Sequence, residues 1–260
     1  MRQFSDQHLA ALAVMAVGII AAVWIGRRGT NRAKTAFAYT LAALILLGWI
    51  GEYIDDAVLG QWSTTYTLPL QLTDAVSAVA VLALLTRRQF PVELTYFWAF
   101  TATLQATLTP DLGQGFPNVL YFTYFLYHLG AIVAAAFLVF GCRHYPRPTA
   151  VWRVFAATLV WAAIAGAADV ITGGNYMYLR AKPLHNSLLS VMGPWPWYIV
   201  GGIGVGLAML LLVAALTELF RGQPLRRILP ATHRLSRNQL RGLYSHAQDL
   251  WLTPRRDPRA

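Results

Sequence analysis

A hydroxyl and an imidazole, the side chains of Thr73 and His128, lie within stretches of the chain that are otherwise strongly apolar. An imidazole can take up or release a proton near neutral pH, and a base beside a hydroxyl can turn that hydroxyl into a nucleophile. Asp74 follows Thr73 directly and Asp169 closes another apolar stretch, so either carboxylate could orient the histidine. Ionisable groups within a bilayer are costly and are functional candidates by default. We therefore expect these four residues to form a catalytic group, with a packing role for a His128–carboxylate hydrogen bond as the alternative.

Other polar residues fall at the same ends of the apolar stretches. Tyr124 and His128 are four residues apart, and Gln71 and Asp74 three apart, so each pair shares one face of a helix. We predict a polar pocket on the outer side lined by Glu52, Asp74, Gln105, His128 and Asp169. The alternative is a set of separate hydrogen bonds between helices. The expected binding residues are Glu52, Gln71, Gln105, Asp111, Tyr124, Asn175, Tyr178 and Lys182.

Apolar segments long enough to span a bilayer must position these side chains. Of the 260 residues 57% are hydrophobic and 12% charged, and the mean hydropathy is +0.46. A bilayer core of about 30 Å takes roughly 20 residues per helix. The sequence predicts an all-α transmembrane bundle with seven spans, of which the third and fourth are short. The expected spans are 8–26, 33–54, 68–86, 91–108, 118–141, 151–171 and 195–220.

Lysine and arginine alternate between the loops, and this alternation predicts the topology. Eighteen of the 21 cations fall on one side of a seven-span bundle and three on the other. Cytoplasmic loops carry the excess of Lys and Arg, so the N-terminus is expected outside and the C-terminus inside. The net charge of +10 is thus assigned to membrane topology, with no nucleic acid partner. The bias of 19 arginines over two lysines fits a GC-rich bacterial genome, and the expected location is the bacterial cell membrane.

The chain divides into a transmembrane bundle, 1–220, and a basic cytoplasmic tail, 221–260. Apolar residues recur at helical spacing between Ser236 and Trp251, which predicts an amphipathic helix on anionic lipid. Gly202 and Gly206 are four apart and predict close helix packing. The histidine spacing marks no ligand set, so no metal and no cofactor are expected.

Several motifs between about residues 50 and 200 resemble the YwaF-like family of bacterial integral membrane proteins. They are LPLQLTD (68–74), LQATLTPD (104–111), Tyr127-His128, NYMY (175–178) with Lys182-Pro183, and GPWPWY (193–198). A eukaryotic relative is described as an acyltransferase for ether phospholipids that uses a Cys and a His. The resemblance aligns that Cys with Thr73 and that His with His128, and it implies a Thr–His pair in place of a Cys–His pair.

These observations lead to a first functional hypothesis, a membrane phospholipid acyltransferase or lipid hydrolase with Thr73 as nucleophile and His128 as base. The loop 172–194, which has several Tyr, Gly and Pro residues and is followed directly by Trp195 and Trp197, would cover the pocket as a lid. The alternative is a transporter or binding protein for a small molecule, in which buried carboxylates carry protons or solute. A retinal protein is excluded because the span 195–220 has no lysine. A purely structural role is the remaining possibility.

Overall fold

The fold is all-α in a computed structural model that describes residues 2–183, 188–222 and 228. The predicted amphipathic tail helix lies outside the described residues. All seven predicted spans are confirmed as helices, the fourth as three consecutive pieces. The elements are α1 (Asp6–Arg28), α2 (Asn31–Val58), α3 (Leu72–Thr86), α4 (Gln89–Trp98), the π-helix η1 (Ala99–Thr103), α5 (Leu104–Leu108), α6 (Val119–Ala136), the π-helix η2 (Phe137–Gly141), α7 (Ala150–Thr172), the 3-10 turns η3 (Tyr176–Tyr178) and η4 (Leu188–Val191), and α8 (Trp197–Phe220).

Five of the described helices, α1, α2, α6 with η2, α7 and α8, are long and apolar enough to cross a membrane. α3 is apolar but has 15 residues, which corresponds to about 22 Å of helix. The sequence predicted this span from residue 68. The helix instead begins at Leu72, because Gln71 has extended backbone angles and serves as its N-cap. The four preceding residues, 68–71, are non-helical.

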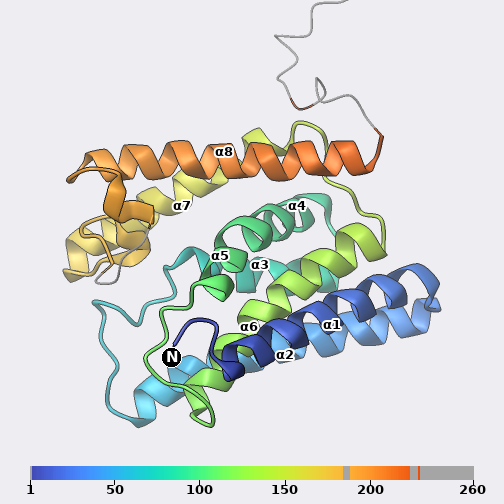
Figure 1. Ribbon diagram of the computed structural model, residues 1–260, viewed down its shortest axis with the longest axis horizontal. Helices are drawn as coiled ribbons and strands as arrows, with labels where there is room; N and C mark the ends of the chain where they lie inside the picture. The colour runs from blue at the N-terminus through green and yellow to red at the C-terminus, as the bar shows by residue number, and fades with distance from the viewer. Residues whose placement is uncertain (1, 184–187, 223–227, 229–260) are drawn as a thin grey trace, which may run out of the picture.

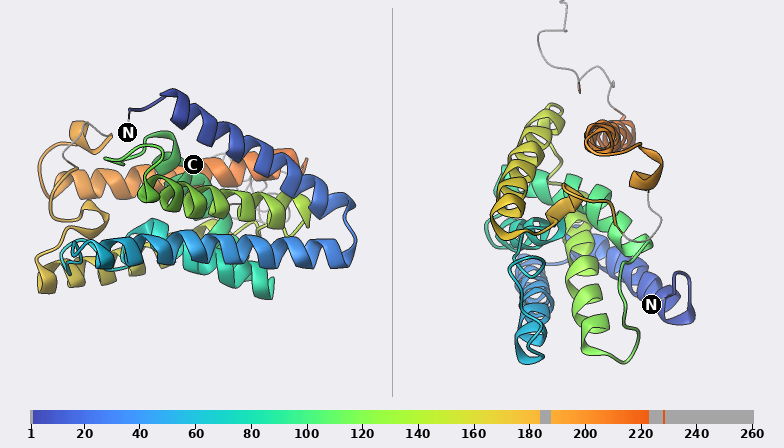
Figure 2. Two further views of the ribbon diagram at one scale, coloured as in Figure 1. Left: turned by 90° about the horizontal axis from the view of Figure 1, so that it is seen from below. Right: turned by 90° about the vertical axis from the view of Figure 1, so that its left-hand side faces the viewer.

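The helices form two groups around the central α6 (Figure 1). α1, α2 and α3 pack directly on α6, and α4 with η1 covers another of its sides. α7 and α8 contact the α4–η1 segment rather than α6, so they lie on the far side of the bundle from α1 and α2 (Figures 1 and 2). Most of α6 is buried, which explains why its sequence is apolar on all faces.

Glycines allow the closest helix contacts around α6. A Cβ atom on Gly26 of α1 would lie 2.5 Å from the Cα of Gly141, and one on Gly48 of α2 would lie 3.0 Å from the Tyr127 amide nitrogen. Small residues of this kind let membrane helices approach backbone to backbone, where dispersion and weak polar contacts replace the hydrophobic effect. The positions of α1 and α2 on α6 thus depend on these glycines.

The end of the bundle where α1, α3, α6 and α8 terminate is basic, and it contains one buried carboxylate with several partners. Glu93 is fully buried and accepts two charge-assisted hydrogen bonds from the Arg147 guanidinium, at 2.8 and 2.9 Å. It also accepts the Arg147 amide at 3.0 Å and Gln89 Nε2 at 3.1 Å. These bonds hold the α6–α7 connection against the start of α4. We call this the basic end and the opposite one the polar end.

A substitution at the α1–η2 contact tests this packing. Gly26→Ala introduces a Cβ that clashes with the Gly141 backbone, so we expect a loss of about 1–3 kcal/mol of stability, as is usual for overpacking. Thermal denaturation of the detergent-solubilised protein, followed by size-exclusion chromatography, measures the effect. Gly204→Ala on α8 is the control, because its Cβ would meet nothing within 4 Å. Equal melting temperatures for the two variants would contradict the close contact.

Candidate functional site

Asp74 is the best-connected carboxylate at the polar end. It is 6% exposed, and its Oδ1 accepts hydrogen bonds from Trp49 Nε1 at 2.9 Å and from the Tyr53 hydroxyl at 2.8 Å. Its Oδ2 accepts the Gln71 backbone amide at 2.9 Å, which caps the N-terminus of α3. A carboxylate at a helix N-terminus is also favoured by the helix dipole. Asp74 therefore holds α3 to α2, and its partners do not include His128.

Glu52 lies beside this network. Its carboxyl is in hydrogen-bonding contact with the Tyr127 hydroxyl and in electrostatic contact with Asp74. The Tyr124 hydroxyl, one turn away on α6, donates to the Ala106 carbonyl of α5 at 2.8 Å. The structure thus brings Glu52, Asp74 and Tyr124 into one polar cluster, which joins α2, α3, α5 and α6.

His128 is enclosed by the two tyrosines of this cluster. Its ring stacks on Tyr124 with 4.0 Å between centroids and lies 4.2 Å from the Tyr127 ring. Its Nδ1 lies 2.8 Å from the Tyr124 carbonyl oxygen. A carbonyl can only accept, so Nδ1 carries the proton and Nε2 of the neutral ring keeps its lone pair. Nε2 has no hydrogen-bond partner among the described residues, which leaves it able to act as a base.

Thr73 occupies the first turn of α3 and is partly buried. Its carbonyl accepts the Ser77 hydroxyl at 2.9 Å, while its own hydroxyl has no hydrogen bond within the described part of the chain. α3 packs against α6, which carries His128. No hydrogen bond joins the Thr73 hydroxyl to the His128 ring among these residues. Catalytic hydrogen bonds in ligand-free proteins often form only when substrate binds.

The segment 173–183 after α7 is held to the bundle by Tyr176. This side chain is fully buried, donates from its hydroxyl to the Thr64 carbonyl at 2.8 Å, and accepts the Leu68 amide at 2.9 Å. The Tyr176 amide donates to Asp169 Oδ1 at 2.6 Å. Asp169 is fully buried and its Oδ2 has no partner in the described residues. Asp169 thus organises this segment and does not contact His128 by a hydrogen bond.

Asn175 organises the same segment from within. Its side-chain oxygen accepts the amides of Arg180 and Ala181 at 3.0 and 2.9 Å, and its nitrogen donates to the Ala181 carbonyl. The guanidinium of Arg180 donates to the Asp169 and Gly174 carbonyls. Every polar atom of the Asn175 side chain is therefore engaged within the loop.

Two consecutive residues of the NYMY motif, Met177 and Tyr178, have positive φ angles of 53° and 57°. Such angles are strained for side chains with a Cβ and persist only where the surroundings impose them. Gln71 Oε1 accepts the Met177 amide at 3.0 Å, and the Tyr198 hydroxyl donates to the Tyr178 carbonyl at 2.8 Å. The Tyr178 hydroxyl lies 3.4 Å from Asp111 Oδ2. Burial and the Asp111 carboxylate raise the pKa of this hydroxyl, so it remains a donor.

Gln105 differs from the other expected site residues. Its side chain is exposed, and its Nε2 donates to the Thr109 hydroxyl at 3.0 Å. It does not join the cluster around Asp74. It lines an apolar cavity of about 330 Å³ between the η1–α5 segment, α7 and α8. Gly202 and Gly206 line the same cavity, so the prediction that they support close helix packing is wrong, and a Cβ on Gly206 would meet nothing within 4 Å.

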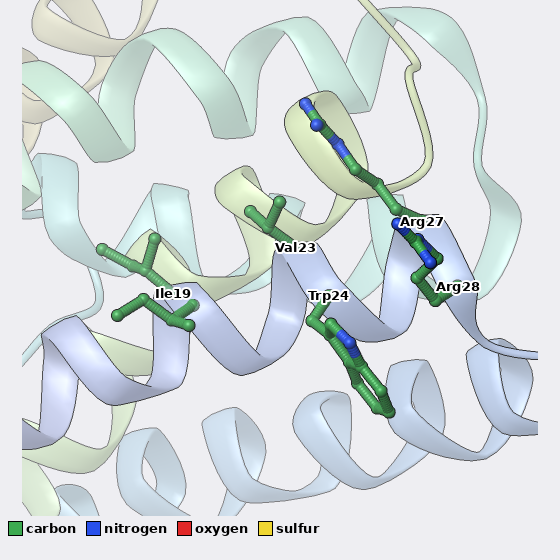
Figure 3. A pocket seen from close by; sticks show the side chains of 6 residues that line it. Ile19, Val23, Trp24, Arg27 and Arg28 are labelled. Carbon is green, nitrogen blue, oxygen red and sulfur yellow. The ribbon is translucent and has the colours of Figure 1, made fainter.

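A second hollow lies on the outer surface of α1, away from the polar end. Figure 3 shows Ile19, Val23 and Trp24 along it, with Arg27 and Arg28 at the end of the helix. Trp24 is largely exposed, and Arg27 donates to the Phe140 carbonyl at 3.0 Å. The hollow has no nucleophile or carboxylate, and its apolar walls are those of a lipid-facing helix surface.

No group of three or more His, Cys, Asp or Glu side chains in the described ranges could hold a metal. His8, which is fully buried, accepts the Phe4 amide at Nδ1 and lies 2.9 Å from the Thr107 carbonyl through Nε2. Both ring nitrogens are thus used to attach the N-terminal segment to the end of α5.

Sequence reasoning missed several residues that hold this site together. Trp49, Tyr53, Tyr176 and Tyr198 each supply a hydrogen bond to it. Trp49, Glu52 and Tyr53 follow an i, i+3, i+4 spacing on α2 and therefore share one face of the helix. This spacing could have indicated a polar contact. Tyr176 and Tyr198 gave no signal beyond their place in the motifs.

The fold and site together define a polytopic helical membrane protein with a hydrogen-bonded polar cluster at one end of the bundle. The chain belongs to the TMEM164 family, a family of membrane proteins whose model matches residues 3–214. The match extends beyond the motif-bearing region of about 50–200, and the YwaF-like assignment itself stays a prediction. No curated protein matches the chain. No solved structure matches it either.

The role of Tyr176 can be tested with Tyr176→Phe. Removing the hydroxyl leaves the half-buried Leu68 amide without an acceptor, so we expect about 1–3 kcal/mol of destabilisation and faster hydrogen exchange in residues 61–71. Hydrogen–deuterium exchange with mass spectrometry measures both. The matched control is Tyr66→Phe, because Tyr66 is exposed and its hydroxyl bonds only within its own loop. Unchanged exchange in Tyr176→Phe would show that this hydroxyl does not hold the α2–α3 connection.

Proposed function

We propose that this protein is a membrane phospholipid acyltransferase or lipid hydrolase in which Thr73 is the nucleophile and His128 the general base. The observation that carries the proposal is the state of His128. A buried imidazole with Nδ1–H fixed by the Tyr124 carbonyl presents an unprotonated Nε2 with no hydrogen bond to the described residues. His8 differs in this respect, because both of its ring nitrogens are engaged by backbone groups.

In this proposal Nε2 of His128 removes the proton of the Thr73 hydroxyl as its oxygen attacks the ester carbonyl of a phospholipid. The tetrahedral intermediate collapses, the acyl chain stays on Thr73, and His128 returns the proton to the leaving lysophospholipid oxygen. A second hydroxyl, from water or an acceptor lipid, then attacks the acyl-threonine with His128 again as base. The Tyr124 carbonyl fulfils the orienting role that Asp74 or Asp169 was expected to have.

The remaining expected residues take supporting roles. Asp74 and Gln71 position the first turn of α3, and with it Thr73. Asp169, Asn175 and Tyr178 shape the loop that borders the cavity. The polar end faces the outer side of a bacterial cell membrane in this proposal, as the distribution of Lys and Arg predicts.

A proton-coupled transporter is the second candidate, and the adjacent carboxylates of half-buried Glu52 and buried Asp74 favour it. A transport pathway also needs ionisable groups toward the other end of the bundle. There, Glu93 is bonded to Arg147 and Glu218 to Arg221 at 3.0 Å. Carboxylates paired in this way are poor carriers, so the enzyme is the better-supported candidate.

The test is comparative lipidomics on cells that express wild type, Thr73→Ala and His128→Ala at matched membrane levels. We expect an acyl-chain change in wild type that falls by about 10²-fold or more in both variants, the usual contribution of a nucleophile or general base. Thr123→Ala is the control, because that hydroxyl bonds only to carbonyls of its own helix. Equal lipid profiles in all four would overturn the proposal in favour of transport.

The role of Thr73 as nucleophile can be tested separately by replacing its hydroxyl with a thiol. Cys142 is the only cysteine, so a Cys142→Ser background makes Thr73→Cys the sole thiol. A thiol is intrinsically the better nucleophile, so we expect this variant to keep lipid-modifying activity and to lose it on treatment with a maleimide. The Cys142→Ser parent should resist the same treatment. Activity that survives complete modification of position 73 would exclude this residue as the nucleophile.

A further inference from the structure

The cavity between η1–α5, α7 and α8 is elongated along the bundle. Its wall on α8 runs from Tyr198 to Leu210, which corresponds to about 18 Å of helix. At about 330 Å³ it falls within the size range of small-ligand sites, and its shape fits a narrow, extended ligand better than a compact one.

Apart from the Gln105 amide, the polar side chains in the cavity wall form hydrogen bonds within the protein. Trp98 Nε1 donates to the Thr158 hydroxyl at 2.8 Å, and the Thr158 hydroxyl donates to the Val154 carbonyl. The Thr101 hydroxyl donates to the Phe97 carbonyl at 2.7 Å. A ligand lying along this wall therefore meets mainly apolar surface, with the exposed Gln105 amide as the exception, and such a wall favours hydrocarbon over a polar occupant.

Glycine gives the cavity its width. Gly206 faces it from α8, and a Cβ there would meet nothing within 4 Å. Gly204, two residues earlier, is also open but faces away and does not line the cavity. Atoms that line an empty apolar space lose their dispersion contacts, so a chain of methylenes in this space would be stabilising.

One cation, Lys182, lies next to the polar end of the cavity, where the Asp111 carboxylate also lies, 3.4 Å from the hydroxyl of the wall residue Tyr178. Lys182 Nζ lies 5.5 Å from the centroid of the Tyr198 ring, which forms part of the wall, and donates to the Ser190 carbonyl at 3.3 Å. An ammonium has three donors, so others remain for an anionic oxygen. Leu72, the neighbour of Thr73, lies in the wall as well. A charged group at Lys182 with a chain along Gly206 is the pattern of a phospholipid.

We propose that this cavity binds one acyl chain of a membrane phospholipid, with the lipid phosphate at Lys182, and that Gly206 sets the chain length it admits. The inference rests on the proposed function for its choice of substrate class. It predicts that phospholipid binds in the cavity whether or not the protein turns it over. The binding proposal can therefore be tested independently of the Thr73–His128 pair.

The experiment is photolabelling of the full-length protein in nanodiscs doped with a phosphatidylglycerol that carries a diazirine in the distal half of one acyl chain. Gly206→Leu fills the cavity, so we expect labelling of the peptide that contains Met209 to fall by about tenfold, the scale on which a few methylenes change binding in an apolar pocket. Gly204→Leu is the matched control and should label like wild type. Wild type that is labelled only on lipid-facing surfaces such as α1 would overturn the proposal.

Two further arms separate the possible failures. Thr73→Ala should label like wild type, which distinguishes loss of binding from loss of catalysis. A diazirine-labelled diacylglycerol lacks the phosphate, so wild type should prefer the phospholipid by several-fold and Lys182→Gln should abolish that preference. Equal labelling by both probes in wild type would refute the phosphate site, and a preference for a labelled free fatty acid would refute the phospholipid as occupant.

Discussion

Burial of the Asp74 carboxylate is the constraint on which the polar end of the bundle depends. A carboxylate enclosed by protein is costly unless its oxygens accept hydrogen bonds, and three donors surround this one. Two come from α2 and the third is the amide that precedes α3. The same contacts thus fix where α3 begins and how it meets α2. Because Thr73 is in the first turn of α3, they also fix the position of the Thr73 backbone.

A second requirement follows from the non-helical chain between α7 and α8. Backbone groups away from water need partners, and irregular chain is tolerated at membrane depth only where it is buried in protein or borders a cavity. Asp169, Asn175 and Tyr176 supply those partners, and they hold Met177 and Tyr178 in strained backbone conformations. Four of the sequence motifs meet at this point because Tyr176, Gln71, Asp111 and Tyr198 bond across it.

The spans could be predicted because bilayer thickness and hydropathy restrict a helix without reference to its neighbours. The membership of the polar cluster could be predicted only in part. The position of Asp74 and His128 within their apolar segments placed both residues correctly at the polar end of the bundle. A single sequence, however, does not show which helices face each other. Asp74 is therefore bonded to Trp49 and Tyr53 instead of His128, and Gln105 faces the cavity. The spacing of Gly202 and Gly206 suits helix packing and an open wall equally, and only the position of α7 decides between them.

The distribution of packing supports the proposed combination of a fixed Thr73–His128 pair with an adaptable lipid site. His128 lies on α6 at the densely packed centre, and Thr73 is partly buried in the first turn of α3, which packs on α6. The apolar cavity lies between that centre and α7 and α8, which are mostly exposed and make fewer contacts. A reactive pair requires positions held within a fraction of an ångström, whereas a hydrocarbon chain requires only volume and an apolar wall. Leu72 is part of that wall, and Thr73 is the next residue along the chain. The proposed reactive hydroxyl and the apolar wall of the cavity are therefore supplied by neighbouring residues at the start of α3.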